Sequence, residues 1–209
     1  MSMNTSPDGL RERKKRAVRA NLSAIALRHA IERGVSQVRV EDIAAEADVS
    51  PRTFNNYFPS KEAAIVGGAI IRAERFCEIL GGQPGGQPLH EALRHTAITL
   101  FEDEPDRDWT ARARLIRAEP SLFAEAAKAD MAIEQRIAAE VGRRTGADPA
   151  TRLAPRLAAA TVVAAIHAAV EFWLDAGHGT LKEAIGEAMS QFRIAEIGDA
   201  SRHGLRSDP

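Results

Sequence analysis

The residues best suited to binding chemistry lie within five consecutive positions, where Arg52, Asn55 and Asn56 occur together. An Arg guanidinium pairs in bidentate geometry with guanine, and an Asn amide pairs in the same way with adenine. Both pairings use base edges in the major groove of duplex DNA, so a helix must carry these side chains into that groove. The group therefore predicts recognition of double-stranded DNA, provided that the flanking residues form such a helix.

The flanking residues predict a helix-turn-helix. A short helix is expected at Val40–Ala47, followed by a tight turn and a second helix from Ser50 to near Tyr57. Ser50 can cap the free amides of the second helix, and Pro51 occupies the first helical position, where its missing N–H does no harm. Small and apolar side chains are present where the two helices must pack, at Ile43, Ala44, Val49, Phe54 and Phe58. In such motifs the N-terminal residues of the second helix face base edges.

The segment VEDIAAEADVSPRTFNNYFPSKEAAI, residues 40–65, resembles the DNA-binding domain of TetR-family transcriptional repressors. Its specific part is the run AxVSxxTFxxYFxSKE, and with the preceding helix, residues 17–34, the resemblance covers about fifty residues. It implies an all-helical, dimeric protein with a ligand pocket in the C-terminal domain. It also implies that a fourth helix, residues 61–80, moves between two states.

Three positions depart from the family pattern. Arg52 stands where the family often has Gly, Asn55 where an aromatic residue is usual, and Arg39 where Thr often opens the second helix. Arg39 loses a hydroxyl cap but can still reach a phosphate. Because two of the three departures lie in the recognition helix, the operator sequence of relatives does not carry over to this chain.

Resemblance and side-chain chemistry together suggest a role for each polar residue of the motif. Contacts with base edges are expected from Pro51, Arg52 and Asn56. Contacts with phosphates are expected from Thr53, Asn55, Tyr57 and Lys61, with Arg39 and the N-terminal basic residues as auxiliaries. For Tyr57 the alternative is half-buried packing with the hydroxyl in water.

The distribution of charge supports a DNA-binding N-terminus. The net charge is −1, from 28 Lys and Arg against 29 Asp and Glu, which alone argues against a nucleic-acid partner. Residues 1–60 nevertheless carry +3 and the remainder −4, and residues 10–33 hold eight basic side chains against two acidic ones. The basic end is where neutralisation of phosphates is expected. The alternative is an ordinary solvated charged run.

Composition and the positions of helix-breaking Gly and Pro residues predict an all-α fold of about nine helices. Ala, Leu, Glu and Arg dominate the sequence, and strand-like alternation is scarce. The helices are expected at residues 10–33, 40–47, 50–57, 61–80, 89–101, 109–118, 121–144, 153–176 (or from 155) and 181–197. The predicted organisation is a disordered tail (1–9), a helix-turn-helix DNA-binding domain (10–60), a helical regulatory and dimerisation domain (61–197) and a second disordered tail (198–209).

A ligand pocket is expected among the helices of the C-terminal domain. Its candidate lining is Leu93, Ala97, Leu100, Phe101, Trp109, Leu115, Phe123, Met131, Val163, His167 and Glu171, although helical apolar stripes often serve only as core. His167 and Glu171 are four residues apart and share a helix face, so they either orient a polar ligand group or form a mutually satisfied core pair. The apolar lining suits a lipophilic or amphipathic molecule.

Dimerisation is expected through the last two helices. The eighth predicted helix is apolar over much of its circumference, and small residues at Ala158, Ala159, Ala165 and Ala169 allow close approach. The ninth is expected to present one apolar face made of Leu181, Ile185, Ala188, Met189 and Phe192. The alternative is a bundle within one chain.

Several classes of protein are excluded by missing motifs. The single cysteine, Cys77, excludes an intramolecular disulfide and a cysteine zinc site, and the sequence has no HExxH, GxSxG, P-loop or Rossmann pattern. The loop GGQPGGQP at residues 81–88 is interpreted as a linker rather than a phosphate-binding loop. No enzymatic activity, cofactor or metal is therefore expected.

The chain is expected to be soluble and cytoplasmic, without a membrane partner. No stretch reaches the roughly 18 apolar residues that span a bilayer, and the longest candidate, residues 157–170, is interrupted by Thr161 and His167. The polar, basic N-terminus is not followed by an apolar segment of the signal-peptide type.

These expectations combine into one functional hypothesis. The chain is expected to be a ligand-responsive repressor that binds a palindromic operator as a homodimer and is released by a small lipophilic or amphipathic effector. The alternative is a DNA-binding activator or architectural protein without a small-molecule switch.

Overall fold

The computed structural model describes residues 7–102, 107–177 and 179–191, which form helices joined by turns and loops. The predicted all-α class is confirmed. By its packing the chain divides into two compact units, which we call the N-terminal unit (residues 1–72 and 106–129) and the C-terminal unit (residues 73–105 and 130–209). Residues 61–72 and 106–129 are predicted to belong to the regulatory domain, whereas the packing groups them with the DNA-binding motif.

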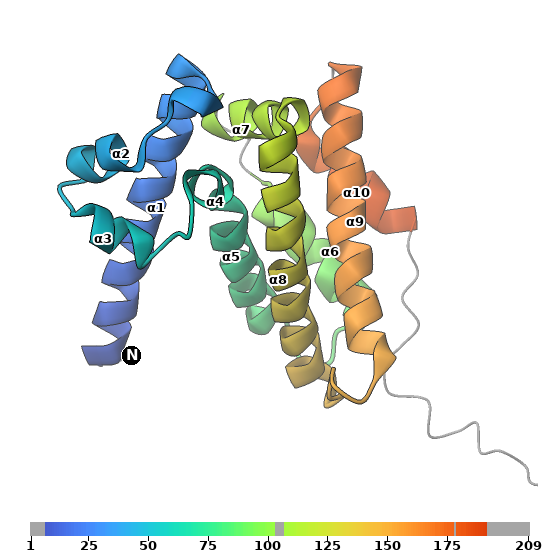
Figure 1. Ribbon diagram of the computed structural model, residues 1–209. Helices are drawn as coiled ribbons and strands as arrows, with labels where there is room; N and C mark the ends of the chain where they lie inside the picture. The colour runs from blue at the N-terminus through green and yellow to red at the C-terminus, as the bar shows by residue number, and fades with distance from the viewer. Residues whose placement is uncertain (1–6, 103–106, 178, 192–209) are drawn as a thin grey trace, which may run out of the picture. The chain divides into compact units, whose positions relative to one another are not determined.

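The N-terminal unit is built from short helices held against one long helix (Figure 1). Its elements are α1 (Pro7–Arg33), the 3-10 turn η1 (Val35–Gln37), α2 (Val40–Glu46), α3 (Pro51–Asn55), α4 (Lys61–Val66), the start of α5 (Gly68–Gly82), α7 (Arg107–Ala118) and the start of α8 (Pro120–Thr145). Helix α1 begins inside the predicted tail and ends where expected. Gly34 follows it with φ 83°, a backbone conformation that favours glycine.

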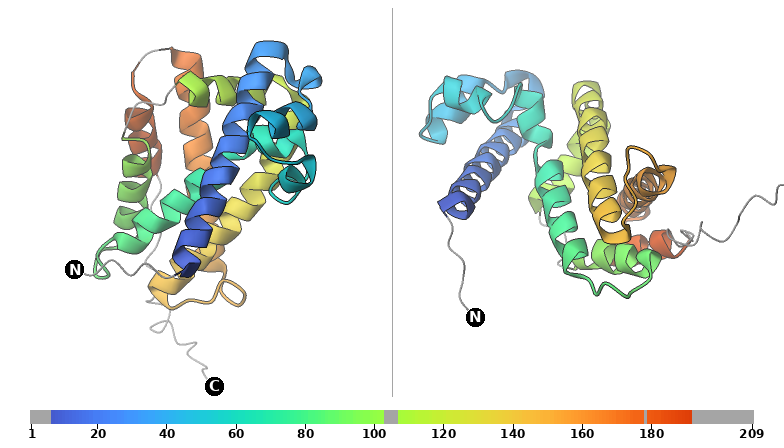
Figure 2. Two further views of the ribbon diagram at one scale, coloured as in Figure 1. Left: turned by 90° about the vertical axis from the view of Figure 1, so that its left-hand side faces the viewer. Right: turned by 90° about the horizontal axis from the view of Figure 1, so that it is seen from below.

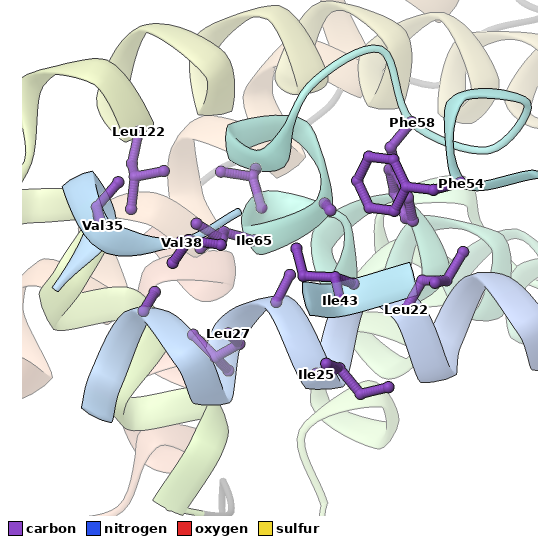
Figure 3. Packing of buried hydrophobic residues seen from close by; sticks show 14 of the residues in the cluster. Leu22, Ile25, Leu27, Val35, Val38, Ile43, Phe54, Phe58, Ile65 and Leu122 are labelled. Carbon is purple, nitrogen blue, oxygen red and sulfur yellow. The ribbon is translucent and has the colours of Figure 1, made fainter. Parts of the chain in front are cut away.

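The core of the N-terminal unit joins residues that are far apart in the sequence (Figure 3). The side chains of Leu22 from α1, Ile43 from α2 and Phe54 from α3 are fully buried together. Ile65 of α4 and Leu122 of α8 close the same cluster. The helix-turn-helix therefore depends on a residue that lies about sixty positions after the motif ends.

The predicted fourth helix, residues 61–80, is wrong as a single element. Helix α4 ends at Val66, the backbone turns at Gly67, and α5 begins at Gly68. Two consecutive glycines weaken a helix because each loses much backbone entropy on folding. Both also allow a close approach, since a Cβ atom on Gly67 would lie 2.7 Å from the Phe58 ring.

The C-terminal unit contains α6 (Leu89–Leu100), α9 (Leu153–Ala176), α10 (Leu181–Gln191) and the remaining residues of α5 and α8. Helix α10 packs on α9 and on α6, which lies beside it in Figure 2. The guanidinium of Arg144 donates hydrogen bonds to the carbonyl oxygens of Gln83, Pro84 and Gln87, at 3.1, 2.5 and 3.1 Å. The glycine-rich loop is therefore anchored within this unit. The last predicted residues, 192–197, and the tail 198–209 lie outside the described part of the chain.

Helix α9 corrects the expectation about apolar length. Its 24 residues are long and apolar enough to cross a membrane by length and composition alone. Core helices of soluble proteins pass the same test, and α9 buries Ala158, Val162 and Ala169 within the chain, with α6 and α10 packed against it. Packing within the chain covers one side of α9 and buries 33% of its apolar window.

Candidate nucleic-acid interface

The turn between α2 and α3 is fixed by backbone and cap hydrogen bonds. Asp48 adopts φ 54°, and the amide of Val49 donates to the carbonyl of Ala44 at 2.9 Å. The Ser50 hydroxyl accepts from the amide of Thr53 at 3.1 Å, which confirms the predicted cap. These contacts set the angle at which α3 leaves the turn.

In helix α3 and the turn after it, the aromatic Phe54 and Phe58 are buried and the polar side chains remain accessible. Phe54 and Phe58 are buried, with ring centroids 5.9 Å apart. The residues expected at base edges or phosphates remain accessible: Pro51, Arg52, Asn55 and Asn56 are exposed, and Thr53 and Tyr57 are partly buried. Two apolar anchors thus hold a polar surface toward solvent, as a recognition helix requires.

Three of the predicted contact residues have other local partners or positions. The Thr53 hydroxyl lies 2.9 Å from that of Ser50, so it shares in the cap. The Tyr57 ring packs against the core cluster, which agrees with the packing alternative for that residue. Arg39 is exposed at the N-cap of α2 and makes no side-chain cap hydrogen bond, so the lost hydroxyl cap is not replaced.

Lys61 has a role that the sequence did not indicate. Its ammonium donates to the carbonyl oxygens of Val35, Ser36 and Val38 at 3.0, 3.3 and 3.0 Å. An ammonium has three donors, so these three carbonyls use all of them. The geometry therefore changes our prediction for Lys61, from a phosphate contact to a clamp that ties the start of α4 to η1.

Acidic residues of α2 pair with basic residues of α1. Glu46 receives both the Arg28 guanidinium and Nε2 of His29, the latter at 2.9 Å, and Asp42 lies 3.7 Å from Arg33. His29 is buried, and its pKa is lowered by burial and by the charges of Arg33 and Arg28. This pairing could not be predicted from local spacing, because Glu46 lies 17 positions after His29.

The pairing leaves the positive charge concentrated in the first half of α1. The basic residues before its core contacts are exposed and lie on one continuous helix: Arg11, Arg13, Lys14, Lys15 and Arg16. Where this stretch meets the core, the Arg19 guanidinium sits 5.3 Å from the centroid of the Phe58 ring. The C-terminal end of the basic stretch therefore lies next to Phe58, three residues after the end of α3.

The predicted pocket residues are divided between the two units. Leu93, Ala97, Phe101 and Val163 are buried in the C-terminal unit, and Leu100 is partly buried there. Leu115 instead packs against the core of the N-terminal unit. Phe123 and Met131 are each 65% exposed, and the side chain of Trp109 lies outside the described part. Apolar helical stripes thus predicted burial at some of these positions and not at others, and the shared pocket stays a prediction.

The predicted core pair of His167 and Glu171 is wrong because α9 turns both residues to the surface. Nε2 of His167 lies 3.5 Å from the Asp130 carboxylate of α8. Burial raises the pKa of Asp130, and the nearby His167 partly offsets that rise. The pairing joins two helices of the C-terminal unit and needs no ligand.

The apolar face predicted for the last helix is also revised. Leu181, Ile185 and Met189 of α10 are buried within the C-terminal unit, and Phe192 lies outside the described residues. Within the described C-terminal unit, three of the exposed large apolar side chains lie on α9, where Leu153, Leu157 and Phe172 are 74%, 60% and 61% exposed, and Met131 lies on α8. The outward residues of α10 are polar, among them Glu183, Glu187 and Ser190.

Metal-binding groups and the single cysteine were the other candidates for reactive chemistry. No group of three or more His, Cys, Asp or Glu side chains among them is placed to hold a metal ion. Burial raises the pKa of the Cys77 thiol to about 11, so it is protonated at neutral pH and a poor nucleophile.

Comparisons with known proteins agree with the geometry. Residues 23–64 match the model described as bacterial regulatory proteins, tetR family, and residues 87–195 match that of the MftR C-terminal domain. The chain is 27% identical over 216 residues to the HTH-type transcriptional regulator TcmR of Streptomyces glaucescens, covering 97% of this chain and 96% of that protein. It is 28% identical over 178 residues to a Mycobacterium tuberculosis protein named as a regulator of mycofactocin biosynthesis, MftR, covering 84% and 89%. A solved TetR-family structure from Syntrophomonas wolfei covers 85% of this chain and 93% of its own at 18% identity, with a TM-score of 0.55.

Proposed function

The chain belongs to the TetR family of bacterial transcriptional regulators, and from that premise we propose that it is a repressor. In this proposal a homodimer binds a palindromic operator and a small molecule releases it. One observation carries the proposal. Helix α3, capped by Ser50, buries Phe54, while Arg52, Asn55 and Asn56 on the helix and at its C-cap stay exposed.

The proposed contacts follow from exposure and chemistry. Pro51, Arg52 and Asn56 face base edges, because they are exposed at the beginning and end of a helix held by the cap and the aromatic pair. Phosphates are bound by Thr53, Asn55, Tyr57, Arg39 and the basic stretch of α1. Lys61 acts indirectly, by holding the η1 carbonyls and therefore the start of α2.

The homodimer is proposed to form chiefly through α9 of the last two helices. The exposed face of α9 carries Leu157 toward one end, Ala164 and Ala168 in the middle and Phe172 toward the other. Two antiparallel copies that cross at the small residues bring Leu157 of each copy against Phe172 of the other. The two-fold axis of such a pair also matches the symmetry of a palindromic operator.

Charges at the ends of α9 support the antiparallel arrangement. Arg152 and Arg156 are exposed at its N-terminal end, and Glu171 and Asp175 are exposed at its C-terminal end. Antiparallel pairing places each basic end near the acidic end of the other copy, whereas parallel pairing places like charges together. The complementarity therefore selects the orientation of the second copy.

The effector is proposed to be a small lipophilic or amphipathic molecule bound in the region of residues 87–195. The support is the apolar composition of that region and its match to a C-terminal regulatory domain model. Thermal unfolding against a library of such compounds tests this part. A regulator with an effector gains stability with at least one compound, because a ligand that binds only the folded state stabilises it. If no compound stabilises the protein, the alternative of an activator or architectural protein is favoured.

The DNA-binding part is tested by selection and substitution. Full-length protein selects duplexes from a random library, and binding of the selected and a scrambled duplex is then compared for wild type, Arg52→Ala and Arg114→Ala. We expect Arg52→Ala to lose about 1–3 kcal/mol on the selected duplex with little change on the scrambled one. Arg114, exposed on α7, serves as the matched control. Failure of the wild type to enrich any sequence would contradict the proposal.

A further inference from the structure

Helices α4 and α5 meet at Gly67 and Gly68, and side chains of the N-terminal unit contact this glycine joint from two directions. A Cβ atom on Gly67 would lie 2.7 Å from Cε1 of the Phe58 ring. A Cβ atom on Gly68 would collide with the guanidinium of Arg112. Gly67 is therefore next to Phe58, which packs against α3, and Gly68 is next to Arg112 of α7.

Arg112 links three helices through one guanidinium. Its Nε donates to the carbonyl of Ile65 in the last turn of α4 at 2.9 Å, and its Nη2 donates to the hydroxyl of Ser23 on α1 at 3.4 Å. Carbonyls near a helix end are those that lack intrahelical donors, so the end of α4 is a natural acceptor for it. Helix α7 is therefore fastened to the point where the α4 helix stops.

Phe58, the other neighbour of the glycine joint, packs against the recognition helix α3. The Phe58 ring pairs with that of Phe54 on α3, with 5.9 Å between centroids, and lies beneath the Arg19 guanidinium. Both rings are buried in a cluster that includes Ile65 (Figure 3). Because packed cores change between discrete arrangements, a displacement of Gly67 must be taken up by Phe58 and then by α3.

We propose that Arg112 is a positioning residue that transmits the conformation of α7 through the glycine joint to α3. The inference rests on the proposed function, since its consequence is a change in DNA affinity. Arg112 lies inside the segment that matches the C-terminal family model, residues 87–195, yet it packs within the N-terminal unit. Arg112 therefore connects this segment of the sequence, through Ile65 and the Gly68 position, to the core that supports the recognition helix.

The first test combines hydrogen–deuterium exchange with DNA binding in full-length Arg112→Met. We expect faster exchange at the amides of residues 64–71 and 51–58, and about tenfold weaker binding to the selected duplex, within the usual range of coupling between sites. The control is Arg114→Met on the same helix, which should change neither. A purely structural role for Arg112 would instead raise exchange evenly throughout the N-terminal unit, and this result would overturn the proposal.

A second variant reaches the same contact without removing Arg112. Gly68→Ala displaces the guanidinium, whereas Gly82→Ala, on the same helix with open space around it, is the matched control. If both substitutions act through one contact, the double variant Arg112→Met/Gly68→Ala binds DNA no more weakly than the stronger single variant. Additive losses, or unchanged affinity and exchange in both single variants, would refute the transmission.

The two hypotheses fail in different ways. If the wild type binds no duplex, the proposed function fails, but the exchange pattern of Arg112→Met still decides whether α7 controls the recognition helix. If the wild type binds its selected duplex and neither variant alters residues 51–58, the proposed function stands and the role of Arg112 falls.

Discussion

The two units differ in the contacts that hold their helices in place. The N-terminal unit fixes short helices with specific polar contacts, such as the Lys61 clamp on η1 and the pairing of Glu46 with α1. The C-terminal unit relies on long, Ala-rich helices and leaves Leu157 and Phe172 uncovered. The unit proposed to present polar side chains to DNA thus fixes its short helices with polar contacts, whereas the unit proposed to meet a second copy leaves apolar side chains of α9 exposed.

The largest contrast between the units should come from their phenylalanines. Phe54→Ala in the N-terminal unit removes a fully buried ring, and we expect a loss of about 3–5 kcal/mol in the free energy of unfolding. Phe172→Ala in the C-terminal unit removes an exposed ring, so the monomer should change by less than about 0.5 kcal/mol. Chemical denaturation at low protein concentration measures both. Equal losses would show that the contrast is mistaken.

The uncovered α9 face gives the next largest effect. Leu157→Asp should raise the dissociation constant of the dimer roughly 100-fold or more, because burial of a Leu side chain contributes about 1.5–3 kcal/mol and is lost in both copies. Light scattering at micromolar concentration should then report the mass of a monomer. Circular dichroism should report unchanged helical content. Glu187→Ala on the polar face of α10 is the control. A wild-type monomer at the same concentration would refute the interface.

The Lys61 clamp predicts a loss shared by stability and DNA binding. Lys61→Met leaves three carbonyls without their charged donor, and hydrogen bonds to charged groups contribute about 1.5–3 kcal/mol each when made well. Because three bonds share one ammonium, we expect a total loss near the value for one bond, measured by denaturation. Affinity for the selected duplex should fall as well, because the clamp holds the start of α4 and therefore positions the motif. Lys128→Met, on the surface of α8, should leave both properties intact.

The smallest effect concerns pH and is confined to the N-terminal unit. The folded pKa of His29 lies below its ordinary value of 6.5, so the unfolded chain binds more protons there and stability falls as pH drops below that value. His29→Gln should flatten this part of the stability profile. His95→Gln, at an exposed position of the C-terminal unit, should leave it unchanged. An identical acid slope in wild type and His29→Gln would contradict the assignment.

The recognition helix could be predicted from sequence because its determinants are contiguous. Ser50, Pro51 and Phe54 cap, start and anchor α3 within five positions, so local rules suffice. The role of Lys61 could not be predicted, since its acceptors at Val35 and Val38 come from a loop more than twenty residues earlier. Spacing identifies a helix face, but only the packing partner decides which way it points.

The same limit explains the errors in the C-terminal unit. His167 and Glu171 share a face as predicted, yet that face is turned outward and His167 meets Asp130 of another helix. The face of α10 that carries Leu181 and Ile185 is buried against α9 and α6 rather than left for a second copy. An apolar stripe predicts that a helix face must be covered. It does not predict whether a helix of the same chain or a second copy covers that face.

The contribution of Leu122 to the N-terminal core limits the modularity of this protein. A fragment that ends after α4, or a chimera that exchanges residues 1–72 alone, would lose Leu122 and the partly buried Leu115 from its core. Transferring the DNA specificity to another regulator therefore requires residues 106–129 to be transferred together with residues 1–72. In evolution the same dependence ties mutations in α7 and the start of α8 to the helix-turn-helix, however freely the rest of the regulatory sequence diverges.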